Sequence, residues 1–307
     1  MIKGVLAFVM ITYEVLSIGP TPTVGIFVYD LPDVLQKSLP TAKYFINASH
    51  TKWLETHSIR FVPIDPESSN LTELLPTLNG IFIPGGIEIY NDQAKLMRYK
   101  EQLAKVYEIA QTLNKDIVYP VFATGFGAQL LFQELIGQDV PMKAVGTSGK
   151  SLSLTFNAID ESVFYKTAQD INAIKAGIYP INTNFQISME DFKKNDRACS
   201  ILNPIATSTD VAASKEEFLM FFELKTIPVY GFFPDIEMIQ FNHADQGFAD
   251  KSLKNMEAAF QMVKFFARLL NKNPNFKAEA EVLALKNGWS FHSSAFPTGE
   301  FEDILWK

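Results

Sequence analysis

The residues best placed for chemistry lie in one short turn, Ala123-Thr124-Gly125-Phe126-Gly127. The uncharged run 117–122 before it predicts a buried strand, and the spacing of apolar residues over 128–136 predicts a helix that lies on a sheet. A strand that runs directly into a helix through small residues is typical of a nucleophile elbow, which presents one side chain at the helix N-terminus. The apex residue is Gly125, so this turn carries no nucleophile. The alternative is a permissive turn, in which glycine supplies positive φ and close packing.

Other residue types that act in catalysis occur elsewhere in the chain. Asp235 and Glu237 follow a predicted strand, and paired carboxylates can transfer protons or bind a divalent ion. No second cluster lies at a suitable spacing, so we predict a solvated loop and no metal site. Thr124 lies beside the apex, and its side chain is expected to point into the fold. Cys199 is the sole cysteine, which excludes an internal disulfide, and we expect it to pack as a small buried hydrophobe.

The four histidines are the remaining candidates for a general base. His50 and His57 fall on or just after a predicted helix, His243 lies in the loop after Glu237, and His292 lies in the C-terminal tail. We expect each of them to be a surface or loop histidine.

Alternating strands and helices must position these residues. Strands are predicted at 23–29, 59–64, 80–86, 117–122, 201–209, 218–224 and 229–233, with shorter ones at 142–157 and 173–178. Helices are predicted at 41–54, 71–78, 92–113, 128–136 and 253–270, with loops at 30–40, 182–186 and 234–237. This order predicts a mostly parallel sheet covered on both faces. Ligands of such sheets bind at the carboxyl ends of the strands, where the Pro84-Gly85-Gly86 loop and the turn at Gly125 meet.

Composition limits the classes of partner. The chain has 307 residues, 47% of them hydrophobic, which is ample for one large core. Its net charge of −7 gives little attraction for nucleic acid. Gly125-Phe126-Gly127 lacks the further glycine and the acidic residue of a dinucleotide-binding fingerprint, so no cofactor is expected.

The N-terminal segment 1–19 is apolar after Lys3 and too short to span a bilayer comfortably. It predicts a secretory signal peptide, with a first strand or a membrane-surface anchor as the alternatives. The sequons at Asn47 and Asn70 are compatible with a glycoprotein on that route. We therefore expect an extracellular, lysosomal or vacuolar protein without a transmembrane span.

Four ordered blocks resemble the gamma-glutamyl hydrolases, secreted or lysosomal cysteine peptidases with a class I glutamine amidotransferase-like fold. The blocks are 44–49 (YFINAS) with 52–55 (KWLE) and 62–64 (VPI), 79–86 (NGIFIPGG), 120–127 (PVFATGFG) and 228–231 (PVYG). The resemblance runs from about Thr23 to Asn273. It implies a flavodoxin-like, three-layer α/β/α sandwich over 20–273. The residues that follow, 274–307, mix helix formers with aromatic residues, and we expect a C-terminal extension that packs back on the domain, with an interaction segment as the alternative.

The family chemistry uses a cysteine thiolate that attacks a γ-linked glutamyl amide, a histidine that moves the proton, and an acidic residue that orients the histidine. The resemblance places Gly125 at the nucleophile position and Asp235 at the histidine position, and leaves Glu237 as the acid. It places the oxyanion and cleft positions at Gly85, Gly86 and Phe126, with Ile87 in place of a third glycine.

Three further positions are expected to contact a ligand. Gln186, which follows Asn184-Phe185, stands where the resemblance implies a second histidine near the substrate. His50 lies on a helix whose counterpart lines the cleft. Asn184, Gln186 and His50 are therefore the possible ligand contacts.

We predict a pseudoenzyme, because loss of the nucleophile or base of such a unit costs about a millionfold in turnover. It would be a ligand- or protein-binding scaffold, with a γ-glutamyl or folate-type ligand, or with a homodimer, a paralogue or a larger assembly as its partner. The alternative is an active folylpoly-γ-glutamate hydrolase that uses rearranged residues. An amidotransferase domain that feeds ammonia to a synthase is a third possibility, and it needs the same absent cysteine.

Overall fold

The structure, a computed structural model, describes residues 21–31, 40–67, 70–85, 92–137, 141–145, 149–209, 215–241, 249–286, 289–295 and 301–306. For 290–295 and 301–306 only the backbone is described. The predicted signal peptide at 1–19, Gly86, Ile87 and His243 lie outside these residues, as does most of the predicted loop 30–40.

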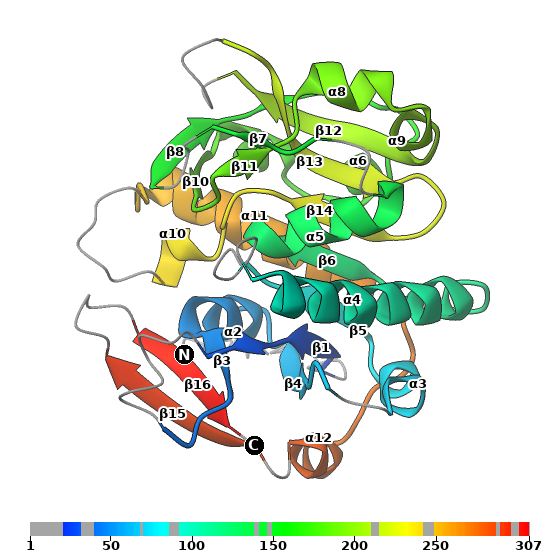
Figure 1. Cartoon of the computed structure of the whole chain (residues 1–307), viewed down its shortest axis with the longest axis vertical. Helices are drawn as coiled ribbons and strands as arrows, with labels where there is room; N and C mark the ends of the chain where they lie inside the picture. The colour runs from blue at the N-terminus through cyan, green and yellow to red at the C-terminus, as the bar shows by residue number, and fades with distance from the viewer. Residues whose placement is uncertain are drawn as a thin grey trace, which may run out of the picture.

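An eight-stranded sheet forms the centre of the described chain, in the order β4-β1-β5-β6-β14-β13-β12-β9 (Figure 1). Its strands are β4 (Arg60–Ile64), β1 (Thr23–Phe27), β5 (Gly80–Ile83), β6 (Val121–Thr124), β14 (Val229–Phe232), β13 (Phe218–Leu224), β12 (Leu202–Ser208) and β9 (Thr155–Phe156). The first five strands run parallel to one another. Each of the last three, β13, β12 and β9, is antiparallel to the strand before it in this order. Strands β1, β5, β6 and β14 are buried at every residue, as their apolar runs predict for strands covered on both faces.

Helices cover the two faces of this sheet. On one face lie α2 (Ala48–Glu55) and α11 (Leu253–Leu270), joined by the Trp53 indole, which donates to the Ala259 carbonyl at 3.1 Å and packs on the Phe82 ring. On the other face lie α5 (Gly125–Ile136) and, packed beside it, α4 (Gln93–Leu113) (Figure 1). Phe82 and Ile83 are neighbours in β5 and so point to opposite faces, and Gly127 of α5 lies against Ile83. The predicted three-layer α/β/α sandwich with a mostly parallel sheet is confirmed.

Shorter elements complete the described chain. The helices are α3 (Leu71–Leu74), η1 (Leu75–Thr77), α6 (Val163–Thr167), α7 (Ile171–Ala176), α8 (Met189–Lys194), α9 (Asp196–Ile201), α10 (Met238–Phe241) and α12 (Glu279–Leu285). Two small antiparallel sheets pair β8 (Lys150–Ser153) with β10 (Ile178–Ile181) and β7 (Lys143–Ala144) with β11 (Phe185–Gln186). None of the helices in the described ranges has the length and hydropathy of a membrane-spanning segment.

The C-terminal tail returns to the start of the chain. Strands β15 (Ser290–Ala295) and β16 (Phe301–Trp306) form a hairpin, and β16 pairs with β3 (Tyr44–Asn47), which pairs in turn with β2 (Tyr29–Asp30). In Figure 1 the red hairpin lies beside the blue strand β3 and helix α2. The tail therefore packs back on the domain, and it does so as added strands.

Two predicted elements are wrong. The helix expected from residue 41 begins only at Ala48, because Asn47 caps it by accepting the Ser49 amide at 2.9 Å and the residues before it pair with β16. The strand expected at 173–178 is mostly helix α7, whose N-terminus is capped by Asp170, which accepts the Ala173 amide at 2.9 Å. In both cases a local cap decides where the helix begins.

Candidate functional site

The turn between β6 and α5 has the geometry of an elbow. Thr124 is the last residue of the strand, and Gly125 is the first residue of the helix. Gly125 has φ of +50°, in the left-handed region that disfavours other residues. The left-handed backbone of an elbow is therefore present, but glycine adopts it without strain and presents no side chain.

The carboxylate of Asp235 fills the space that a side chain at this position would use. A Cβ added at Gly125 would overlap Asp235 Oδ1, and a Cβ added at Gly85 would overlap the same oxygen. The other carboxylate oxygen accepts the Asn182 amide at 2.8 Å, and the Asp235 amide donates to the Pro180 carbonyl at 2.9 Å. Asp235 is only 3% exposed, so the prediction of a solvated loop is wrong. The loop after β14 turns inward because Pro180 of β10 binds its backbone and Asn182, just after β10, binds its carboxylate.

The beginning of α5 suits a carboxylate. Thr124, the N-cap residue, makes no side-chain capping hydrogen bond. Its hydroxyl instead accepts the Gly85 amide at 3.1 Å, so an amide that the resemblance assigns to the oxyanion already has an acceptor within the protein. Helix N-termini carry a positive partial charge that favours an anion. Asp235 supplies that anion from another loop.

A buried histidine and carboxylate lie next along the same loop. His50 Nε2 of α2 is 2.7 Å from Glu237 Oε1, and the two residues are 3% and 0% exposed. Within the described residues neither side chain makes a hydrogen bond of good geometry. The ring of His50 packs beside Phe82, with centroids 6.1 Å apart. The predictions of a surface histidine and a solvated glutamate are wrong, because α2 lies flat on the sheet and contacts α10, which begins just after Glu237.

Tyr29 is a site residue that the sequence does not single out. Its hydroxyl donates to the Pro84 carbonyl at 2.7 Å, and its ring lies 6.3 Å from that of Phe126, between centroids. Burial, and then the charges of Tyr99 and Asp235, raise the pKa of Tyr29 well above its ordinary value. The phenol therefore remains a neutral donor that holds the loop after β5.

Gln186 is tied to the elbow helix through its neighbour. Gln129 of α5 donates to the Phe185 carbonyl at 2.8 Å, which brings β11 next to that helix. Gln186 is fully buried, and its Nε2 donates to Thr183 Oγ1 at 2.8 Å. Its Oε1 makes no hydrogen bond to the described residues. Asn184 is exposed.

The remaining candidates lie apart from the elbow. Cys199 is exposed, and its Sγ donates to the Phe192 carbonyl at 3.4 Å, so the prediction of a buried thiol is wrong. It lies on the surface of α9 and not in a strand. The ring of His57 packs 4.3 Å from that of Phe260, and burial, with the charge of Lys264, lowers the pKa of His57. In the described part of the chain no three acidic, histidine or cysteine side chains lie close enough together to hold a metal ion.

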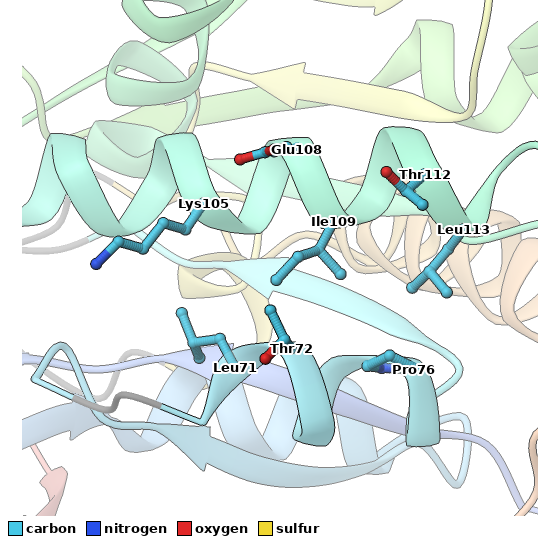
Figure 2. A pocket seen from close by; sticks show the side chains of 8 residues that line it. All are labelled: Leu71, Thr72, Pro76, Lys105, Glu108, Ile109, Thr112 and Leu113. Atoms are coloured by element: carbon cyan, nitrogen blue, oxygen red, sulfur yellow. The ribbon is translucent and has the colours of Figure 1, made fainter.

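A separate pocket of about 520 Å³ lies between α3 with η1 and helix α4. Figure 2 shows Ile109 and Leu113 of α4 pointing toward Leu71 and Pro76 across this space. None of the predicted site residues lines it. This pocket is therefore distinct from the elbow.

The chain is similar in sequence to mammalian gamma-glutamyl hydrolases. It is 25% identical to the gamma-glutamyl hydrolase of Homo sapiens over 270 residues, which cover 85% of this chain and 81% of that protein. It is 24% identical to the gamma-glutamyl hydrolase of Bos taurus over 282 residues, which cover 87% of this chain and 85% of that protein. It is 24% identical to the gamma-glutamyl hydrolase of Mus musculus over 260 residues, which cover 82% of this chain and 78% of that protein. No family model matches the chain. The resemblance carried by the four sequence blocks is thus confirmed along most of the chain.

Two solved structures match nearly their full length. A GMP synthase subunit from Thermoplasma acidophilum has a TM-score of 0.46 at 13% identity, covering 82% of this chain and 98% of its own. The glutaminase domain of Trypanosoma brucei CTPS, with bound acivicin, has a TM-score of 0.49 at 14% identity. The match covers 84% of this chain and 98% of that domain.

Proposed function

We propose that this chain is a non-catalytic relative of the gamma-glutamyl hydrolases that keeps their scaffold for binding a ligand or a protein. One observation carries the proposal: Gly125 at the elbow has no side chain, and the Asp235 carboxylate fills the space where one would stand. A cysteine hydrolase needs a thiolate and a nearby base at this place. Loss of the thiolate or of the base lowers turnover by about a millionfold.

A γ-glutamyl or folate-type compound is the small ligand that the proposal favours. Oε1 of Gln186 is buried and makes no hydrogen bond to any residue that the structure describes, which supports a ligand that donates a hydrogen bond, such as an amide, because buried acceptors are usually satisfied. If the scaffold binds a protein instead, we propose as its partner a second copy of the chain, a paralogue or a larger assembly.

An active hydrolase with rearranged residues is the second candidate, and the His50–Glu237 pair favours it, since a histidine beside a carboxylate is the base of many hydrolases. The available nucleophiles argue against it. The hydroxyl of Thr124 is buried and accepts the Gly85 amide. Cys199 is on α9, where the neighbouring Arg197 binds the Leu135 carbonyl. Leu135 lies ten residues along α5 from Gly125, about 15 Å by helical rise.

We also propose a secretory location, supported by the apolar segment 1–19 and the two sequons. Asn70 is exposed, whereas the Asn47 side chain caps α2 and accepts both the amide and the hydroxyl of Ser49. Asn70 is therefore the site at which we expect a glycan. A glycosidase-sensitive mass shift that persists in Asn47→Gln and vanishes in Asn70→Gln would establish this.

The experiment for the main proposal combines binding and activity. Purified chain is titrated with pteroyl-polyglutamate by calorimetry and run on gel filtration, and products are sought by mass spectrometry beside a Gly125→Cys, Asp235→His variant. Binding or a stable complex without wild-type products is the expected result. Products from the wild type that survive repurification would refute the proposal.

A further inference from the structure

We propose that Asp235 seals the elbow: its carboxylate takes the place of the missing side chain at position 125 and neutralises the N-terminal end of α5, which excludes acyl groups and external carboxylates from this point. The inference rests on the proposed absence of catalysis. It goes further by assigning to Asp235 a second effect, the exclusion of outside acyl groups and carboxylates from this point.

Gly125, Gly85 and Asp235 crowd together at the elbow. A Cβ at Gly125 would meet Asp235 Oδ1 and would also lie 3.0 Å from Gly85 Cα. A Cβ at Gly85 would meet the same carboxylate oxygen. The carboxylate thus lies against two facing glycine backbones, and a thiol at position 125 requires it to leave.

The Asp235 carboxylate is compensated electrostatically in this enclosed place. A buried charge is costly unless it is compensated. Oδ2 of Asp235 has the Asn182 amide at 2.8 Å, while Oδ1 faces the first residue of α5, a helix of 12 residues that Thr124 does not cap. The positive end of the helix and the backbone donor together stabilise the charge.

Gly127, which follows Gly125 in the same turn of helix, provides a matched control. A Cβ there would lie 2.5 Å from the carbonyl oxygens of both Ile83 and Pro84, without contact to Asp235 among its nearest atoms. Alanine at Gly127 is therefore strained by the backbone at the end of β5. Alanine at Gly125 is strained by its φ of +50° and, in addition, by a carboxylate that can be removed.

The first test measures whether a thiol at position 125 is accessible. Gly125→Cys is made in a Cys199→Ser background, so that only one thiol is present, and is compared with Gly125→Cys/Asp235→Gly for the rate of alkylation by iodoacetamide. We expect alkylation at least tenfold faster when Asp235 is replaced by glycine. Asp235→Asn removes the negative charge beside the thiolate but keeps the volume of the side chain, so the Asp235→Gly variant should also react faster than the Asp235→Asn variant, which likewise lacks the charge. Equal rates with and without the Asp235→Gly substitution would overturn the proposal.

The second test uses smaller changes, in case the cysteine variant does not fold. The loss in melting temperature caused by Gly125→Ala is measured with and without Asp235→Gly, and the same is done for Gly127→Ala. Removal of the carboxylate should reduce the loss for Gly125→Ala and leave that for Gly127→Ala unchanged. Losses that change equally at the two glycines, or not at all, would contradict sealing by Asp235.

These outcomes can be told apart from failure of the proposed function. Rapid alkylation of Gly125→Cys alone would refute the seal and leave the elbow without a nucleophile in the native chain. Hydrolysis by the native chain would refute the proposed function, whatever the alkylation rates of the variants.

Discussion

Replacement of His50 by leucine should destabilise the chain strongly. His50 lies 2.7 Å from Glu237, and in the described part of the structure no other side chain or backbone group makes a hydrogen bond to that carboxylate. Glu237 is 0% exposed, so His50→Leu leaves a carboxylate buried without a partner. Breaking a buried pair in this way costs about 3–5 kcal/mol. Replacing both members by apolar residues of similar volume is often nearly neutral, so His50→Leu/Glu237→Leu should recover much of the loss.

Urea unfolding followed by tryptophan fluorescence measures these effects, because Trp53 is fully buried beside the same part of the sheet. Lys166→Leu is the control, since it breaks an exposed pair with Glu161 and should have little effect. The reasoning would be refuted if His50→Leu cost less than about 1 kcal/mol, well below the loss expected for a buried pair. A double variant as unstable as the sum of the two single variants would also refute it.

Three further predictions concern other parts of the fold. Burial lowers the pKa of His57, so the unfolded chain binds a proton at this histidine more readily than the folded chain does. The free energy of unfolding should therefore be unaffected by His57 above about pH 6.5 and should decrease as the pH drops below that value. In thermal melts between pH 7 and pH 5, His57→Gln should reduce this decrease. Asn79→Ala should cost about 2–4 kcal/mol in chemical unfolding, because it leaves the buried Thr23 amide and Asn273 carbonyl without the Asn79 side chain; a loss near zero would contradict this. Deletion of 289–307 should speed hydrogen exchange in β3, which loses its partner β16, and unchanged exchange would show that the pairing is not maintained in solution.

Much of the α/β fold could be predicted from local patterns. Uninterrupted apolar runs such as β1 and β5 identify buried parallel strands, and Gly125-Phe126-Gly127 between a strand and a helix identifies the elbow. The C-terminal hairpin could not be predicted in this way. Its strands are defined by pairing with β3, at the other end of the chain.

The arrangement of the site depended on contacts between distant residues. The sequence shows that Asp235 follows a strand, but its inward turn depends on the Asn182 amide, 53 residues away. The burial of His50 likewise depends on how α2 lies on the sheet and where it meets Glu237. Short polar loops have no periodicity from which such burial can be read.

The most direct test of the account is a turnover measurement at equal concentrations of protein and pteroyl-polyglutamate, at acid and neutral pH, with products identified by mass spectrometry. The account predicts that the native chain releases no glutamate or shortened product over a day of incubation. Products that increase in proportion to the native protein and persist through repurification would contradict it.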